Sequence, residues 1–213
     1  MSSPTVTPPA AGWWRRNRWA LAALPVVLVL TVVAAGDRVR TLWWEQDLHA
    51  PVAVDADATG ELHQRVYDGV GGTMPIDVRV HLDGVGDATT LPRDMELPDG
   101  TRAVRVDLTL SADPDIVLAG CELAVRDAAG TRYEYEANAW GAFQAVVPCV
   151  PEDTPGPAPS LGDLDDVLSE RESAPRPATW SVSPVIVLPD DVEVTEVVLW
   201  WQKPQYLQLE VPG

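Results

Sequence analysis

Histidines, cysteines and carboxylates are the residues of this chain that could do chemistry. The three histidines, His49, His63 and His81, do not form the His-Glu-x-x-His pattern of a zinc protease, and no serine stands in a Gly-x-Ser-x-Gly elbow. The 32 aspartates and glutamates could include a catalytic pair, but no spacing singles one out. We therefore assign no catalytic residue, cofactor or metal ligand. A cell-envelope hydrolase that uses two of these carboxylates is the alternative.

The acidic segment 55–61 resembles the first half of a calcium loop, with oxygen-bearing side chains at its first, third and fifth positions and glycine at its sixth. Such a loop ends on a bidentate glutamate at position twelve, which is Val66 here, and it needs two flanking helices. We interpret the segment as a solvated acidic turn. A second acidic group, Asp163, Asp165 and Asp166, is interpreted as a charged helix face.

Cys121 and Cys149 are the only cysteines in the chain. An even count in an oxidising compartment favours a disulfide. The bond would close a loop of about 28 residues, which chain entropy values at roughly 3 kcal/mol or somewhat more. Two separate buried thiols are the alternative. A zinc site is not expected, because the cysteines are far apart and no histidine lies near them.

One apolar run, residues 19–36, decides where these side chains are placed. It contains no charged residue, and as a helix it would be about 27 Å long, close to the thickness of a bilayer core. Tryptophans favour membrane interfaces, and five of them flank the run: Trp13, Trp14, Trp19, Trp43 and Trp44. We therefore expect a transmembrane helix that contacts membrane lipid.

Positive charge before the run predicts its orientation. Arg15, Arg16 and Arg18 precede it, which favours a cytoplasmic N-terminus and an extracytoplasmic C-terminal domain. The alternative is a signal peptide cleaved after Ala35, with residues 33–35 as the small-residue site, which would release a secreted β-sandwich. Because signal peptides have apolar cores of only about 7–15 residues, we favour retention in the cell membrane.

This topology divides the chain into four parts. Residues 1–18 are expected to be a disordered cytoplasmic tail and residues 19–36 the transmembrane helix. Residues 37–50 are expected to be a juxtamembrane stalk that continues the helix, and residues 51–213 the extracytoplasmic domain. The net charge is −17, so nucleic acid is not expected as a partner. We interpret the acidity as a source of solubility, with recognition of a cationic partner as the alternative. The tail is too short to hold a signalling domain, so any signal must pass through a protein partner.

Beyond Pro51 the apolar residues recur with a period of two, which is typical of half-buried strands. About seven or eight strands are expected, and turn residues between them favour an antiparallel sandwich or barrel. The clearest strands are 76–82, 104–110, 121–125, 133–135, 143–147, 180–188, 192–201 and 206–211. A Pro-rich insertion, residues 151–177, interrupts them. A short helix beginning near Ser160 is predicted within it, with a disordered excursion as the alternative.

Trp200 and Trp201 are adjacent, so in a strand they face opposite sides of the sheet. One can lie in the core while the other lies at the surface, where it would form a contact site. The alternative is that a loop or the membrane covers it.

Residues 121–135, with the later segments 187–200 and 205–211, resemble the telokin-like, immunoglobulin-like extracellular domains of actinobacterial secreted and membrane-anchored proteins. The shared features are a strand, an Asp-x-x-Gly turn into a tyrosine-bearing strand, and a Pro-Asp-led pair of C-terminal strands. The resemblance implies an immunoglobulin-like β-sandwich that interacts with proteins or envelope components, and it implies no active site. We expect a non-enzymatic binding or accessory domain, a partner of a membrane complex in the cell envelope.

Overall fold

The computed structural model of this chain describes residues 11–68, 71–158 and 174–212. The chain divides into two compact units, residues 1–47 and 48–213. In its described residues the first unit contains the helix α1 (Ala11–Val39), which continues into a π-helical segment, η1 (Arg40–Trp44). Within the described residues, one apolar helical segment, Gly12–Leu42, has the length and composition of a membrane span, and a signal sequence near an N-terminus would have them too.

The helix extends further in both directions than the apolar run alone. Residues 11–18, which we expected in a disordered tail, are helical, because adding residues to an existing helix is far less costly than starting one. Residues 1–10 lie outside the described residues. Pro25 lies inside α1, and the helix continues past it. The segment after the apolar run stays helical as far as Trp44.

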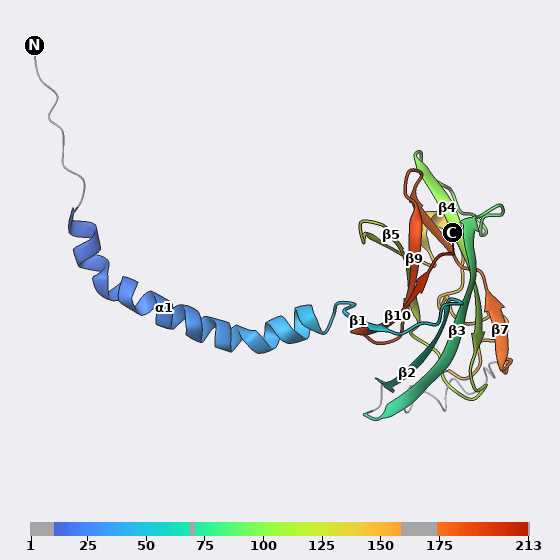
Figure 1. The fold of residues 1–213 in the computed structure, drawn as a ribbon, viewed down its shortest axis with the longest axis horizontal. Helices are drawn as coiled ribbons and strands as arrows, with labels where there is room; N and C mark the ends of the chain where they lie inside the picture. Colours follow the sequence, from blue (N-terminus) through green and yellow to red (C-terminus); the bar gives the residue numbers. More distant parts are fainter. Residues whose placement is uncertain (1–10, 69–70, 159–173, 213) are drawn as a thin grey trace, which may run out of the picture. The chain divides into compact units, whose positions relative to one another are not determined.

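The second unit is mainly β, as the sequence predicted (Figure 1). Its described residues form two five-stranded sheets, whereas about seven or eight strands were predicted. The first sheet has the order β1–β10–β9–β5–β6, formed by β1 (Ala50–Val52), β10 (Gln205–Glu210), β9 (Val194–Trp200), β5 (Glu122–Asp127) and β6 (Arg132–Glu134). The second has the order β2–β3–β4–β7, with β8 also paired to β4. Its strands are β2 (Thr59–Tyr67), β3 (Thr73–Asp87), β4 (Thr101–Ser111), β7 (Thr179–Val182) and β8 (Val185–Pro189). All pairs are antiparallel except β1 with β10.

Alternating side chains place the main core between the two sheets. In β3, Ile76, Val78 and Val80 are buried while Asp77 and Arg79 are exposed, so burial has the period expected of a half-buried strand. The inward-facing residues of β4, β5, β9 and β10 join the same cluster. The predicted strands 76–82 and 104–110 are confirmed.

Two predicted strands differ from the structure. The segment 180–188 forms two strands, β7 and β8, because Pro184 has no N–H to donate to a ladder; its carbonyl instead accepts from Val106 at 3.0 Å. The segment 143–147 is not a strand, and it makes only an isolated bridge between Phe143 and Arg93. Phe143 and Val146 are exposed, whereas Val147 is partly buried against the main core.

The described ends of the Pro-rich insertion contain no strand and lie side by side. The Gly156 N–H donates to the Ala174 carbonyl at 3.2 Å. Gly156 has a φ of +81°, and a Cβ there would lie 2.9 Å from the Arg176 guanidinium, so this close approach requires glycine. The helix predicted from Ser160, together with the Asp163, Asp165 and Asp166 group, lies outside the described residues.

Candidate functional site

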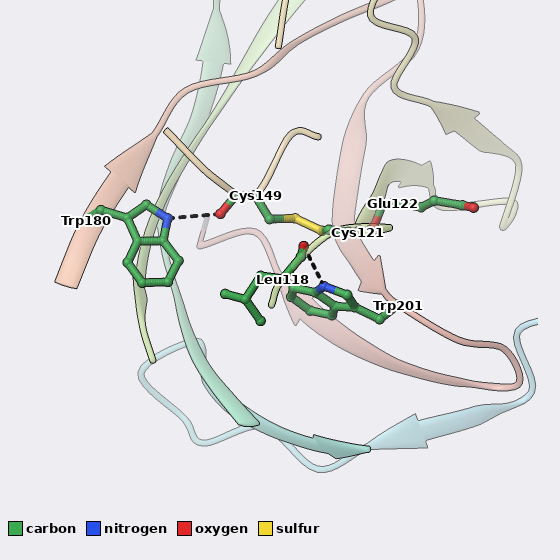
Figure 2. Close-up of a disulfide and its surroundings, with 6 residues drawn as sticks. All are labelled: Leu118, Cys121, Glu122, Cys149, Trp180 and Trp201. Carbon is green, nitrogen blue, oxygen red and sulfur yellow. Dashed lines mark hydrogen bonds between the residues drawn. A yellow bond between two sulfur atoms is a disulfide. The ribbon is translucent and has the colours of Figure 1, made fainter. Parts of the chain in front are cut away.

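A disulfide between Cys121 and Cys149 confirms the predicted pairing (Figure 2). Both residues are buried, and their Cα atoms are 6.1 Å apart. Two indoles pack near the bridge and donate to main-chain carbonyls: Trp180 Nε1 to Cys149 at 2.9 Å, and Trp201 Nε1 to Leu118 at 3.1 Å. The disulfide and the hydrogen bond from Trp180 hold the chain in place at Cys149, just before the Pro-rich insertion begins.

Arg176 holds the base of this insertion. This residue is only 1% exposed. Its guanidinium donates to the carbonyls of Asp113 at 2.9 Å, Ile116 at 2.8 Å and Pro155 at 3.2 Å. The guanidinium carbon also lies 4.7 Å from the centre of the Trp180 ring. Burial lowers the pKa of Arg176, while the charge of Asp113 raises it. One side chain thus joins two loops to the tryptophan that contacts the disulfide.

Residues 137–148, which we call the Trp140 loop, end next to Cys149 and present large apolar side chains to solvent. Trp140 is 51% exposed, Phe143 66% and Val146 82%. This is the segment in which the sequence predicted a strand. Exposed groups of large apolar side chains are characteristic of contact sites.

The backbone of the Trp140 loop is held by the neighbouring segment 91–97. The Glu96 N–H donates to the Trp140 carbonyl at 2.8 Å, and the Phe143 N–H donates to the Arg93 carbonyl at 3.1 Å. Trp140 lies in the left-handed region, with φ of 56° and ψ of 34° inside η2 (Ala139–Gly141), which is unusual for so large a side chain. A Cβ at Gly141 would lie 2.7 Å from the Asp94 carbonyl oxygen, so glycine is required there.

The segment 91–97 adds two more exposed apolar residues. We call the whole set the apolar patch, and its members are Leu91, Leu97, Trp140, Phe143 and Val146. In the described part of the second unit, Tyr67 on β2 is the one other large apolar residue that is exposed. The exposed apolar side chains are therefore concentrated on two loops that hydrogen bonds join.

Three hollows border the Trp140 loop. One of about 400 Å³ is lined by Tyr135 and Phe143, a second of about 190 Å³ by Met95 and Trp140, and a third of about 270 Å³ by Tyr135 and Val146. The Tyr135 hydroxyl donates to the Ala145 carbonyl at 2.6 Å. Burial, with a smaller contribution from the charge of Glu152, raises the pKa of Tyr135 to about 12. The Tyr135 phenol thus stays neutral and stabilises the Trp140 loop by donating to its main chain.

Trp200 and Trp201 do not form the contact surface that we considered. They face opposite sides of the first sheet, as expected, but Trp200 is 1% exposed and Trp201 9%. Trp201 joins the main core, while Trp200 joins a small cluster on the outer face with Tyr206 and Leu48. Cations complete the cover. They lie over the outer-face rings: Arg132 and Lys203 at 5.7 and 5.6 Å from the Trp200 centre, and Arg126 at 5.0 Å from the Tyr206 centre.

The acidic segment 55–61 forms a turn that leads into β2, with Asp55 and Thr59 joined by a backbone hydrogen bond of 2.7 Å. Asp55, Asp57 and His81 line a hollow of about 780 Å³. Among residues 11–68, 71–158 and 174–212, no three histidine, cysteine, aspartate or glutamate side chains are grouped as a metal site requires. The described residues of this turn therefore give no metal site to argue from.

Two of the three histidines contact different residues. His63 on β2 is exposed and its Nδ1 lies 3.0 Å from Asp77, whereas His81 on β3 has its Nδ1 2.9 Å from the Thr59 hydroxyl. His49 precedes β1. These contacts of His63 and His81 thus place the two side chains with different partners.

The residues assigned to the membrane boundary lie at the two ends of the first unit. Trp13, Trp14, Trp19 and Trp44 are exposed, and so are Arg15, Arg16 and Arg18. The side chain of Trp43 lies outside the described part. Their contact with lipid stays a prediction.

No protein-family model and no curated protein sequence matches this chain. Among solved structures, the secreted protein MPT63 of Mycobacterium tuberculosis is similar at 14% sequence identity and a TM-score of 0.40, over 75% of this chain and 99% of that one. The proposed function therefore rests on the chain's own residues.

Proposed function

We propose that this chain is a single-pass membrane protein that holds an immunoglobulin-like β-sandwich outside the cytoplasm. There the sandwich binds another protein of the cell envelope and catalyses no reaction. The observation that carries this proposal is the apolar patch. Large apolar side chains that are exposed together commonly mark a surface that a partner covers.

The first unit and the disulfide support the location. The helix α1 includes the charge-free run, and the three arginines before it favour a cytoplasmic N-terminus. A disulfide persists in an oxidising compartment, which matches a domain outside the cytoplasm.

The geometry of the Trp140 loop supports protein binding. Tryptophan is enriched among the residues that dominate binding energy at protein interfaces. Hydrogen bonds to a second loop hold Trp140 in a sparsely populated backbone conformation. Its backbone therefore has little conformational entropy left to lose on binding. This is the arrangement expected of a preformed contact site.

Photo-crosslinking in native membranes tests the proposal. The full-length protein would carry p-benzoylphenylalanine at Trp140 or Phe143, with Tyr67 as the matched control, because it is also aromatic and exposed but lies on β2. We expect a discrete protein adduct from the two patch positions and none from Tyr67. No adduct from either patch position would contradict the proposal.

A secreted form is the second candidate, because α1 has the length and composition of a signal sequence as well as of a membrane span. Cleavage after Ala35 would release a β-sandwich beginning at Gly36. Sequencing the N-terminus of the mature protein separates the two candidates. A start at Gly36 removes the anchor but leaves the contact site.

A further inference from the structure

We propose that the apolar patch receives a cationic as well as apolar segment of a partner protein, one that presents arginine or lysine beside aliphatic side chains. The inference rests on the proposed function and names the chemistry of its partner. It is carried by the charges that surround the patch.

Every charged side chain that lines the three hollows is a carboxylate. Glu152 is the charged lining residue of the 400 Å³ hollow, Glu134 and Glu136 are those of the 190 Å³ hollow, and Glu122 and Glu134 are those of the 270 Å³ hollow. A segment that places aliphatic side chains in these hollows therefore brings its neighbouring residues against negative charge. Complementary charge at this rim would steer association and select against anionic partners.

Most of these carboxylates are not neutralised within the chain. Glu134 is neutralised by Arg132, whose Nε lies 2.9 Å from its carboxylate. In the described part of the chain, no ion pair is formed by four exposed acids at the patch, Asp94, Glu96, Glu136 and Glu152. Arg93 is the single cation on the segment 91–97. The patch thus has a surplus of negative charge that a partner can complement.

The same charges disfavour two other occupants. A second copy of this chain would bring an identical set of carboxylates to the interface, and the chain as a whole has a charge of −17. An anionic lipid surface would be repelled in the same way. A cationic protein segment is the occupant for which both the apolar and the charged features of the patch are favourable.

Binding of defined peptides to the full-length protein in phosphatidylcholine nanodiscs tests this. The probes are eight-residue peptides of alternating arginine and leucine, glutamate and leucine, or arginine and serine, with empty nanodiscs as the blank. We expect the arginine–leucine peptide to bind at least about tenfold more tightly than either of the others, and less tightly as salt rises. Equal binding of the glutamate–leucine peptide would overturn the inference.

Matched variants locate the binding. Glu136→Lys with Glu152→Lys should weaken binding of the arginine–leucine peptide at least about tenfold, and Trp140→Ala should do the same. The control pair, Asp57→Lys with Asp190→Lys, makes the same change in net charge at acids that line none of the three hollows, and it should have little effect. An equal loss in the control pair would overturn the inference.

The crosslinking experiment separates failure of this inference from failure of the proposed function. If the adduct at Trp140 persists undiminished when Glu136 and Glu152 become lysine, the partner is not cationic, although the contact site stands. If Trp140 yields no adduct in any variant, the proposed function itself fails. Binding to phosphatidylglycerol nanodiscs that depends on Trp140 would replace the protein segment with lipid and overturn the inference.

Discussion

The side-chain amide of Gln144 pairs with the main chain of Val185 in both directions. Its Nε2 donates to the Val185 carbonyl and its Oε1 accepts from the Val185 N–H, each at 3.0 Å. The Gln144 side chain thus makes the two backbone hydrogen bonds that a neighbouring strand would make to Val185 in β8. It ties the Trp140 loop to the second sheet, and it occupies backbone groups that another chain could otherwise pair with.

Replacing Gln144 by alanine should lower the free energy of unfolding by about 1–3 kcal/mol, because both partly buried main-chain groups of Val185 lose their partner. Chemical denaturation of the full-length protein measures this, and hydrogen exchange at the Val185 amide should become faster. Gln202→Ala, at an exposed glutamine, is the control and should change stability by less than about 0.5 kcal/mol. Unchanged exchange at Val185 would contradict the pairing.

Removing the disulfide should destabilise the second unit. Chain entropy for a loop of 28 residues gives a loss of about 3–4 kcal/mol when Cys121 and Cys149 are both replaced by serine. A reductant should lower the unfolding midpoint of the native protein and leave the double variant unaffected. Thiol labelling supplies the control: both cysteines should react only after reduction. Labelling without reductant would argue against the bond in the cell.

Arg176 should not be replaceable by lysine. A lysine ammonium lacks the planar fork that reaches carbonyls on two loops and lies over the Trp180 ring, so we expect Arg176→Lys to cost about 2–4 kcal/mol. Arg79→Lys makes the same exchange on the exposed face of β3 and should cost less than about 0.5 kcal/mol. Thermal or chemical unfolding of both variants decides the matter, and equal losses would show that the buried fork has no special role.

Tyr135 should make stability fall at high pH. Its pKa is about 12 in the folded protein, against about 10 for an unfolded tyrosine, so the folded state favours the neutral phenol. That contribution is fully present below about pH 10 and is lost as the pH rises to about 12. Unfolding midpoints between pH 9 and 12 measure it.

Tyr135→Phe is the matched variant for this pH dependence. It loses the hydrogen bond to Ala145, about 1 kcal/mol, at every pH, and it removes the part of the decline that this phenol contributes. An identical decline in the native protein and in Tyr135→Phe would assign the effect to other groups.

The fold class could be predicted because the β3 and β4 segments have one buried and one solvated face, and that difference is recorded in residue types with a period of two. The pairing of Cys121 with Cys149 followed from the count of two cysteines and from the expected location of both outside the cytoplasm. Both inferences need only local or whole-chain information.

The candidate site could not be predicted in the same way. The segment 143–147 alternates like a strand, but its exposure depends on hydrogen bonds to residues 91–97, about fifty positions earlier. Trp200 is buried because Leu48 and Tyr206 pack beside it and two cations lie over its ring. The role of Arg176 depends on carbonyls of two distant loops. The one local signal was the tryptophan beside glycine at 140–141, in the loop that leads to the disulfide cysteine Cys149.

Arg176 and the bond from Gly156 to Ala174 also bear on how this chain tolerates changes in length. The two ends of the Pro-rich insertion are already brought together and fastened to the sandwich. The closure entropy of lengthening the chain between them is about 0.6 kcal/mol for each doubling. The described contacts at the base of the Pro-rich insertion should therefore let the two sheets keep their register when a peptide tag or a foreign domain lengthens the chain between Gly156 and Ala174.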